Sequence, residues 1–210
     1  MGKSGVRPKD IASSVRQQMP GAIITSKAVQ NALSKVRKEE LAGRAPIKAL
    51  IETLSSDDFS SNVRLEGTRV VSVFFAHTRS LELCQRCNIA FGIDCTYKTN
   101  KVGMPLLNIV GITATFQTFN AAFAFMSSED ENSYIWAMEQ FRQHAMPTGL
   151  ATDRELALMN AIAKVFPSTK LVLCAWHIDK NILANCKKFF NDDDEFGAFM
   201  KSWAEVVKTK

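Results

Sequence analysis

The stretch Asn88-Ile-Ala-Phe-Gly-Ile-Asp-Cys-Thr-Tyr-Lys-Thr-Asn100 decides how the fold of this chain is interpreted. It begins with the apolar run of a buried strand, and Asp94 stands where that run meets polar residues. A second aspartate, Asp153, ends a similar short apolar approach that starts at Gly149. Two carboxylates at the ends of buried strands can hold a hard divalent cation. Each aspartate alone also fits a strand-end cap or a turn residue, whereas the pair favours a site.

Length and composition limit the class of protein. The chain has 210 residues, 46% of them hydrophobic, which suffices for one sizeable core and a small appended module. Its apolar stretches are interrupted well before the ~18 residues of a membrane span, and the polar, basic N-terminus lacks a signal-peptide core. The five cysteines fit reduced thiols of an intracellular protein better than a disulfide framework. We therefore expect no secretion, no membrane insertion and no disulfides.

Positive charge is concentrated near the N-terminus. Residues 1–48 contain ten Lys and Arg and three Asp and Glu, a net charge of +7 in a chain whose total is +5. A basic front on a slightly acidic body is typical of a chain that meets a polyanion such as DNA. A solvated helical face explains the same cluster equally well. The candidate DNA-binding residues are Lys27, Lys35, Arg37, Lys38 and, further along the chain, Lys98.

The basic segment, residues 1–45, shows two short helical patterns between about residues 9 and 41. Pro20-Gly21 separates them, and Thr25 or Ser26 is the expected N-cap of the second helix. Two short helices joined by a turn can form a helix-turn-helix whose second helix contacts DNA. The alternative is a pair of helices that only pack against each other.

The rest of the chain predicts an α/β fold. Residues 47–54 form another short helical pattern, and the core is expected at 46–190, followed by a helical tail at 191–210. Strand patterns occur at 69–76, 89–95, 106–116, 119–126, 150–153 and 170–175, and helical patterns at 78–87, 131–145, 156–165 and 178–190. Three antiparallel strands followed by alternating helices and strands predict a mixed sheet with helices on both faces, and this is the element order of the ribonuclease-H-like fold.

This order predicts where the two aspartates lie. The strand that carries Asp94 and the strand that precedes Asp153 should be neighbours at the centre of the sheet. Neighbouring strands are ~4.8 Å apart, so the two carboxylates could share metal ions that lie ~4 Å from each other. Such ions can activate a hydroxyl nucleophile and stabilise a leaving 3′ oxygen. The sequence contains no Gly-rich phosphate loop and no paired-cysteine zinc motif that would compete for the chemistry.

Four motifs in order carry a resemblance to a known family. They are Ile93-Asp-Cys-Thr-Tyr-Lys-Thr-Asn100, Met104-Pro-Leu-Leu-Asn108, Thr152-Asp-Arg-Glu-Leu-Ala-Leu-Met-Asn160 and Cys174-Ala-Trp-His-Ile-Asp-Lys-Asn-Ile182. Together they resemble the transposase domain of Mutator-like elements, the fungal and oomycete type in particular, from about residue 40 to the C-terminus.

The resemblance implies a DDE-type transposase, a nuclease that uses Mg²⁺ or Mn²⁺ to nick DNA at element ends and join the freed 3′ hydroxyl to a target. Asp94 and Asp153 match the first two catalytic acids and metal ligands of that family. Cys174 and His177 match its Cys-x-x-His motif, with a structural or DNA-positioning role. From the residues alone, Cys174 is also explained as an apolar core thiol. The resemblance further implies DNA as partner, a nuclear location and a homo-oligomer as one option.

The third acid of that family has no clear counterpart. In the family it is a glutamate that follows a helical insertion, and here only Glu195 and Glu205 lie in the helical tail. We assign the role to neither. Glu155 could supply a substitute ligand or simply begin the next helix. The chain is therefore expected to be a truncated form with weak metal binding.

Three functional hypotheses follow. The first is a transposase catalytic domain, active or inactive in this form. The second is a DNA-binding or transcription-regulating protein that kept the fold and lost the chemistry, which the missing glutamate and the basic N-terminus favour. The third is an unrelated ribonuclease-H-like nuclease, which the Cys-x-x-His motif argues against.

Overall fold

The computed structural model describes residues 6–97, 99–100 and 102–208, and the side chains of Arg37 and Lys208 lie outside the description. The chain divides into two compact units, of which the first ends at Thr53 and the second begins at Leu54. Within the described residues, no helix has the length and apolar character that a membrane crossing requires. The five cysteines are free thiols.

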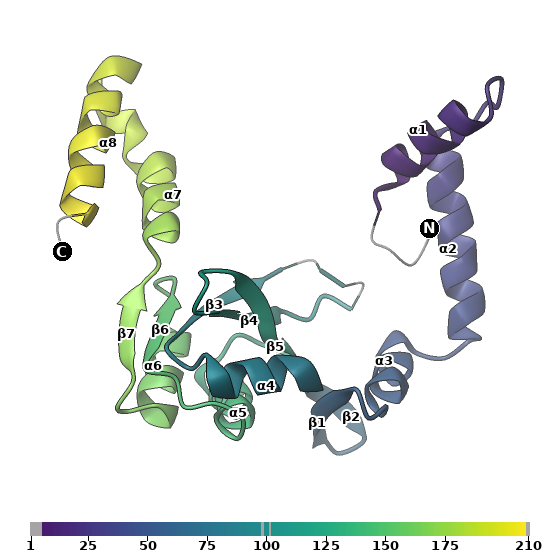
Figure 1. Cartoon of the computed structure of the whole chain (residues 1–210), viewed down its shortest axis with the longest axis horizontal. Coiled ribbons are helices and arrows are strands. Elements are labelled where there is room, and N and C mark those ends of the chain that lie inside the picture. The colour runs from purple at the N-terminus through teal and green to yellow at the C-terminus, as the bar shows by residue number, and fades with distance from the viewer. Residues whose placement is uncertain (1–5, 98, 101, 209–210) are drawn as a thin grey trace. The chain divides into compact units, whose positions relative to one another are not determined.

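The first unit is helical. Its elements are α1 (Pro8–Gln18), α2 (Ser26–Leu41) and α3 (Pro46–Leu54), which continues to the first residue of the second unit (Figure 1). Thr25 is the N-cap of α2, because its Oγ1 accepts a hydrogen bond of 3.1 Å from the backbone N–H of Ala28. Ala42 and Gly43 end α2 in the left-handed region, with φ of 48° and 78°. The predicted pair of N-terminal helices is confirmed, and α1 packs against α2.

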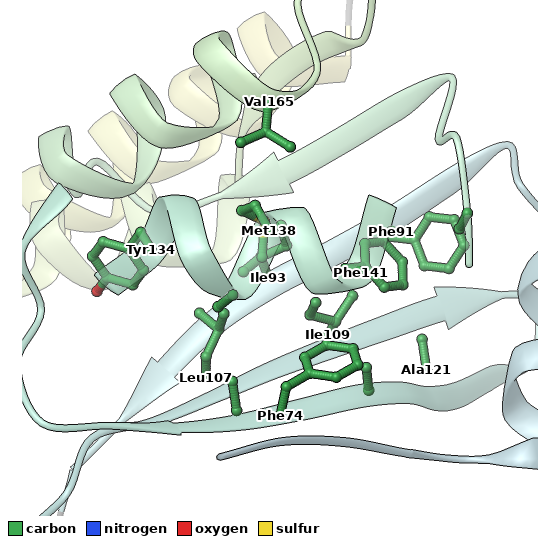
Figure 2. Close-up of a cluster of buried hydrophobic side chains, with 14 of the residues drawn as sticks. Phe74, Phe91, Ile93, Leu107, Ile109, Ala121, Tyr134, Met138, Phe141 and Val165 are labelled. Carbon is green, nitrogen blue, oxygen red and sulfur yellow. The ribbon is translucent and has the colours of Figure 1, made fainter. Parts of the chain in front are cut away.

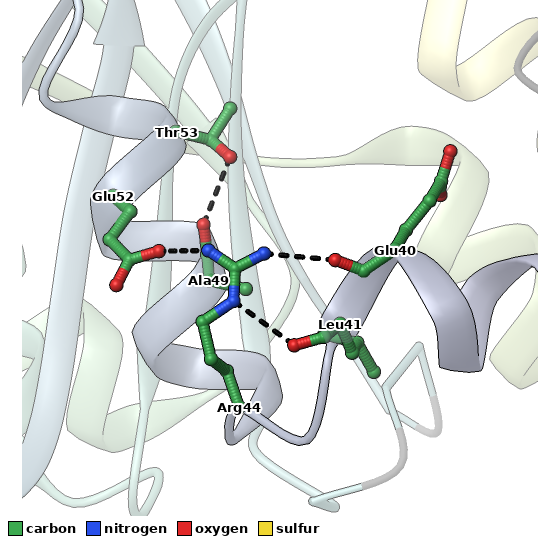
Figure 3. Close-up of polar contacts among 6 residues, drawn as sticks. All are labelled: Glu40, Leu41, Arg44, Ala49, Glu52 and Thr53. Atoms are coloured by element: carbon green, nitrogen blue, oxygen red, sulfur yellow. Dashed lines mark hydrogen bonds and ion pairs between the residues drawn. The ribbon is translucent and has the colours of Figure 1, made fainter.

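Arg44 joins α2 to α3 (Figure 3). Its guanidinium donates hydrogen bonds to the carbonyl oxygens of Leu41 at 3.0 Å and Glu40 at 2.9 Å, and it forms an ion pair with Glu52 of α3. The carbonyls in the last turn of a helix have no partner within that helix, so a planar donor group satisfies two of them at once. The turn between α2 and α3 is therefore fixed by one side chain.

The second unit is built on a seven-stranded mixed sheet. Its strands are β1 (Phe59–Glu66), β2 (Arg69–His77), β3 (Ala90–Thr96), β4 (Leu106–Ile112), β5 (Thr118–Met126), β6 (Gly149–Thr152) and β7 (Lys170–Leu173). They lie in the order β1-β2-β5-β4-β3-β6-β7. All neighbours are antiparallel except β3 with β6 and β6 with β7, which are parallel. The predicted α/β class and mixed sheet are confirmed.

The helices of this unit are α4 (Thr78–Arg86), α5 (Glu131–Arg142), α6 (Leu156–Val165), α7 (Ala175–Asn185) and α8 (Asp193–Lys208), with a short 3₁₀ turn at Lys187–Phe189. Asp130 caps α5 by accepting a hydrogen bond of 2.8 Å from the N–H of Ser133. The indole N–H of Trp203 in α8 donates to a carboxylate oxygen of Asp179 in α7 at 2.7 Å, which ties the last two helices together.

The core lies between the sheet and α5 and α6. Figure 2 shows Tyr134, Met138 and Phe141 of α5 over the side chains of the central strands, and the buried cluster includes Phe91 and Ile109. Because β5, β6 and β7 are parallel and the chain steps across the sheet in one direction, right-handed crossovers place α5 and α6 on the same face. Helices on the second face, which the sequence also predicted, remain a prediction.

The opposite face carries a row of aromatic side chains. Phe75 pairs with Phe123 in the register of β2 and β5, and Val73 pairs with Phe125. Side chains alternate along a strand, so these residues point away from Phe74, which lies on the face of α5. The ring of Phe75 stacks on Phe123 and Phe125, with centroids 5.4 and 6.1 Å away.

Several predicted boundaries were wrong. Strand β1 was not predicted, because its sequence Phe-Ser-Ser-Asn-Val-Arg-Leu-Glu alternates weakly and is half exposed. The strand predicted at 106–116 ends at Ile112, because Thr113–Gln117 forms a turn in which Phe116 has φ of 60°. The helix predicted at 178–190 begins earlier, at Ala175, and ends at Asn185.

Gly111 of β4 lies under an aromatic cluster and tests the packing of the core. A Cβ at this position would lie 2.4 Å from Phe119 and 2.9 Å from Phe91, and Phe91 is fully buried. We expect Gly111→Ala to lower the free energy of unfolding by about 1–3 kcal/mol, because an overpacked core must shift. Urea denaturation measures the change.

Gly92 of β3 provides the matched control. An added Cβ there meets no atom within 4 Å. We expect Gly92→Ala to change the free energy of unfolding by less than about 0.5 kcal/mol. Equal losses in the two variants would contradict the described packing.

His144 predicts a dependence of stability on pH. Its ring stacks on Phe74 with centroids 6.2 Å apart, its Nε2 is buried without a partner, and burial lowers its pKa below the ordinary value of 6.5. Below pH 6.5 the unfolded chain therefore takes up a proton that the folded chain resists. Stability should be full above that pH and fall as the pH decreases toward the lower pKa of the folded state.

The measurement is the urea midpoint of the wild type and His144→Gln at pH 7.5 and 5.5. The difference between the two pH values should be smaller in the variant, whatever its stability at pH 7.5. An unchanged difference would show that other groups cause the pH dependence.

Candidate active site at the carboxyl edge of the sheet

The strands that carry the two aspartates are direct neighbours. β3 pairs with β6 in parallel, and the last paired positions are Ile93 and Thr152. Asp94 and Asp153 each follow one of these positions. Parallel neighbours are ~4.8 Å apart, so the two residues begin from adjacent points of the sheet. The predicted adjacency of the two strands is confirmed.

The two aspartates differ in their local structure. Asp153 directly follows the end of β6, whereas Asp94 lies inside β3, which continues to Thr96. The sequence had suggested that both stand at strand ends, and this was wrong for Asp94. Ile93 points into the core, so alternation turns Asp94 to the opposite face, where its side chain is 49% exposed. That exposure leaves the carboxylate accessible.

His177 brings α7 to Asp94. Cys174 is the N-cap of α7, and its backbone N–H donates to the carbonyl of Thr152 at 2.7 Å, which places the start of the helix beside the end of β6. His177 lies in the first turn, and its Nε2 is 3.5 Å from Oδ1 of Asp94. The other ring nitrogen, Nδ1, is buried and has no hydrogen-bond partner. The imidazole of α7 therefore lies beside the carboxylate of β3.

A cleft of about 620 Å³ opens beside this histidine. It is lined by Asp153, Arg154, Glu155, Leu173, Cys174, His177, Ile178, Lys180, Asn181, Ile182, Ala184 and Asn185. His177 thus touches Asp94 on one side and lines the cleft of Asp153 on the other. The structure brings together the four predicted residues Asp94, Asp153, Cys174 and His177 at one edge of the sheet.

The carboxylates have weak hydrogen-bond partners. The hydroxyl of Thr96 donates to Oδ2 of Asp94 at 3.4 Å, and the hydroxyl of Thr152 donates to Oδ1 of Asp153 at 3.3 Å. Both donors are neutral, so each aspartate keeps oxygen lone pairs for a cation. Two such oxygens fit as part of a Mg²⁺ or Mn²⁺ ligand set. In the described part of the chain, however, no group of three or more His, Cys, Asp or Glu residues is arranged to hold a metal ion.

Three glutamates were considered as the third acid. Two of them accept hydrogen bonds at the starts of helices, and the third lies on α8. Glu155 caps α6, because its carboxylate accepts a hydrogen bond of 3.3 Å from the N–H of Ala157. Glu195 accepts hydrogen bonds from the backbone N–H and the side-chain amide of Asn191 at 2.9 and 3.0 Å. It thereby fixes the start of α8. Glu205 is an exposed residue of α8.

The basic residues predicted to contact DNA lie elsewhere. Lys27, Lys35 and Lys38 are exposed on α2 in the first unit. The side chain of Arg37 and the whole of Lys98 lie outside the described residues. Within the cleft itself, Arg154 and Lys180 supply positive charge next to the acids. Their place in the cleft was not predicted from sequence, although both stand inside motifs that carry the family resemblance.

Two further polar residues at this edge were missed. Asn108 of β4 is the cross-strand partner of Asp94, and its Oδ1 is buried without a partner. Glu129, which follows β5, accepts a hydrogen bond from the hydroxyl of Tyr97. These contacts depend on strand register and on the parallel direction of β3 and β5, which one sequence does not reveal. The Met104–Asn108 motif was a usable signal for Asn108.

The partly buried thiol of Cys95 and the buried groups of Tyr134 and Cys84 are uncharged at neutral pH. Burial, together with a hydrogen bond to Glu129, raises the pKa of the Cys95 thiol. Burial also raises the pKa of Tyr134, and it raises that of Cys84 to about 12. Thiols with raised pKa values are poor nucleophiles. The groups at this edge that remain available for chemistry at neutral pH are its carboxylates and the imidazole of His177.

Comparison with known proteins identifies a related family. The model of a protein family described as the MULE transposase domain matches residues 90–181, which include both aspartates and the Cys-x-x-His motif. The resemblance to the transposases of Mutator-like elements is thereby confirmed for residues 90–181.

Individual relatives share about a quarter of their aligned residues with this chain. The chain is 27% identical over 97% of its length to the PKS-NRPS hybrid synthetase cheA of Chaetomium globosum, of which it covers 5%. It is 24% identical to two proteins of Arabidopsis thaliana, FAR1-RELATED SEQUENCE 7 over 58% of the chain and FAR1-RELATED SEQUENCE 5 over 84%. It spans 16% and 24% of those two proteins. The chain is thus similar to a small part of each relative.

Asn108 provides a test of whether this edge is built for function at the expense of stability. Its buried Oδ1 has no partner, and a buried unsatisfied acceptor costs about 1–3 kcal/mol. Asn108→Leu keeps the branching of the side chain at Cγ, with a larger volume, and removes that acceptor. We expect its free energy of unfolding to equal or exceed that of the wild type by up to about 1 kcal/mol in urea denaturation. A loss above 1 kcal/mol would show that the amide stabilises the fold.

Proposed function

We propose that this chain carries the catalytic core of a DDE-type DNA transposase with a ribonuclease-H-like fold. The observation that supports this most directly is the placement of Asp94 and Asp153 after paired positions of two parallel strands, with His177 between Asp94 and the cleft of Asp153. The substrate would be duplex DNA, cleaved at phosphodiester bonds of element ends. A nuclear location and assembly of more than one copy on DNA belong to the same proposal.

The strand order supports the proposed fold. Strands β5, β4 and β3 are antiparallel neighbours, and β6 and β7 continue the sheet in parallel on the other side of β3. This is the order expected of a ribonuclease-H-like sheet, with β1 and β2 added at the antiparallel edge. In such a sheet, sites form at the carboxyl ends of the parallel strands. Asp94, Asp153 and His177 are all at that end.

Each residue has a proposed role. Asp94 and Asp153 would be ligands of Mg²⁺ or Mn²⁺, which when bound supplies Lewis-acid stabilisation of a phosphodiester under attack. His177 would orient the carboxylate of Asp94 through Nε2 and leave Oδ2 for the cation. Arg154 and Lys180 line the cleft, where their charges would attract the DNA backbone. The backbone N–H of Cys174 donates to the carbonyl of Thr152 and thereby places the start of α7 beside the end of β6.

A second candidate function is DNA binding without cleavage. Glu195, one of the glutamates in the C-terminal tail, is occupied in capping α8 through Asn191. A site with two acids would bind a cation weakly, whereas the basic residues of α2 and the cleft would still contact DNA. The two candidate functions differ in whether the protein nicks DNA when a divalent metal is added.

The test uses the full chain, a supercoiled plasmid, and Mg²⁺ or Mn²⁺. We expect metal-dependent nicking by the wild type, and we expect Asp94→Asn and Asp153→Asn to reduce it to the level without metal. His177→Ala should retain nicking at a rate about 10–100-fold lower, because residues that orient metal ligands have effects of this size.

Asp57→Asn is the matched control, since Asp57 is exposed and precedes β1, next to the end of β2 at the opposite edge of the sheet. It should nick like the wild type. Salt-sensitive DNA binding with no nicking, unchanged in Asp94→Asn, would support the second candidate. Nicking that survives both Asp94→Asn and Asp153→Asn would exclude these residues as the catalytic acids.

A further inference from the structure

Helix α2 presents a continuous polar stripe to solvent. Lys27, Asn31, Ser34 and Lys38 follow one another at intervals of four, three and four residues, and all four are exposed. Residues at this spacing lie on one face of a helix. Gln30 and Lys35, also exposed, flank the row. We call these six residues the α2 stripe.

The stripe faces away from the helix that supports α2. The apolar residues Val29 and Leu33 are half-buried and lie on the other side of α2, since each residue advances about 100° around a helix. Helix α1 packs against α2 and contributes the fully buried Ala12. The apolar contacts of this unit thus account for one side of α2 and leave the stripe without a packing role.

The charge along the stripe has one sign. From Ser26 to Lys38 the helix contains no acidic residue, and its acids, Glu39 and Glu40, come in the last turn. The capped N-terminus adds the positive end of the helix dipole. A ligand that lies along the first three turns therefore meets positive charge and amide groups, with the acids beyond its far end.

The side-chain types specify the ligand. Asn and Gln can form paired hydrogen bonds with adenine in the major groove, Ser can bond to several base edges, and Lys binds phosphate or guanine. From Lys27 to Lys38 the helix rises about 16 Å, and the major groove is ~12 Å wide. We propose that the α2 stripe binds the major groove of duplex DNA, with Gln30 and Asn31 at base edges and Lys27 and Lys38 on phosphates.

This arrangement differs from the helix-turn-helix considered from the sequence. Residues 19–25 connect α1 and α2, which is longer than the three or four residues typical of that motif. The proposal therefore rests on the face of α2 and not on motif geometry. It also rests on the second candidate function, DNA binding, and is independent of the proposed catalysis, because its residues belong to the first unit and the carboxylates to the second.

The experiment measures binding of the full chain to labelled duplexes by fluorescence anisotropy between 50 and 200 mM salt, after selection of preferred sites from a randomised duplex pool. Lys27→Ala/Lys38→Ala should weaken binding to all sequences and reduce the slope of log affinity against log salt by about 2, one for each phosphate contact. Asn31→Ala and Gln30→Ala should lower the preference for the selected site on the order of 10-fold with an unchanged slope.

Two matched controls lie outside the stripe. Lys170→Ala removes an exposed lysine at the start of β7, and Asn62→Ala removes an exposed amide on β1. Both should bind like the wild type. Circular dichroism of each variant checks that α2 remains folded, and Lys27→Gln/Lys38→Gln, which keeps polar side chains of similar length, should reproduce the smaller slope.

Three outcomes would overturn the proposal, and one would support it. An unchanged affinity and slope in both double-lysine variants would mean that the stripe is a solvated face. Equal affinity for duplex RNA, whose major groove is too narrow for a helix, would exclude major-groove binding. Binding that persists in Asp94→Asn/Asp153→Asn, with nicking lost, would support a stripe that acts independently of the carboxylates. Complete loss of DNA binding in Asp94→Asn/Asp153→Asn would contradict the assignment of that binding to α2.

Discussion

The pairing of β3 with β6 is the constraint on which the rest of the site depends. Backbone hydrogen bonds fix Ile93 opposite Thr152, and the buried side chains of Phe91, Ile93 and Leu150 hold this register from the core side. A slip of one residue would exchange the two faces of a strand and turn Asp94 into the core beneath α5. The burial of an unpaired carboxylate costs far more than this sheet could tolerate. Hydrophobic packing therefore determines where the acid lies.

The second half of the site follows from backbone geometry at the end of β7. Cys174 leaves the strand, bonds to Thr152 through its N–H and begins α7 at once. This early start sets His177 in the first turn of the helix, within reach of Asp94. Had the helix begun at Ile178, as its apolar pattern suggested, His177 would belong to a loop. The contact between α7 and α8 through Trp203 and Asp179 then holds the helix that carries the histidine.

The sequence predicted the elements with strong periodicity and short connections. The helix at Leu156–Val165 has the predicted bounds, and the neighbouring strands of Asp94 and Asp153 were expected from element order alone. β1 was missed because Ser60, Ser61 and Asn62 break its apolar alternation. Asn108 and Glu129 were missed because their positions depend on cross-strand register and strand direction, which are long-range properties. The family resemblance pointed to the acids and the histidine, and its Met104–Asn108 motif included Asn108 without indicating that Asn108 pairs with Asp94.

The irregular pairing of β1 has a consequence for behaviour in concentrated solution. The register of β1 against β2 shifts between Arg64 and Leu65, and Arg64 and Glu66 place opposite charges along this outermost strand. Unpaired backbone groups at the margin of a sheet can recruit a strand from another molecule and start aggregation. A kinked, charged margin resists such recruitment even though Val63 and Leu65 are exposed. Straightening it would expose a flat template for self-association.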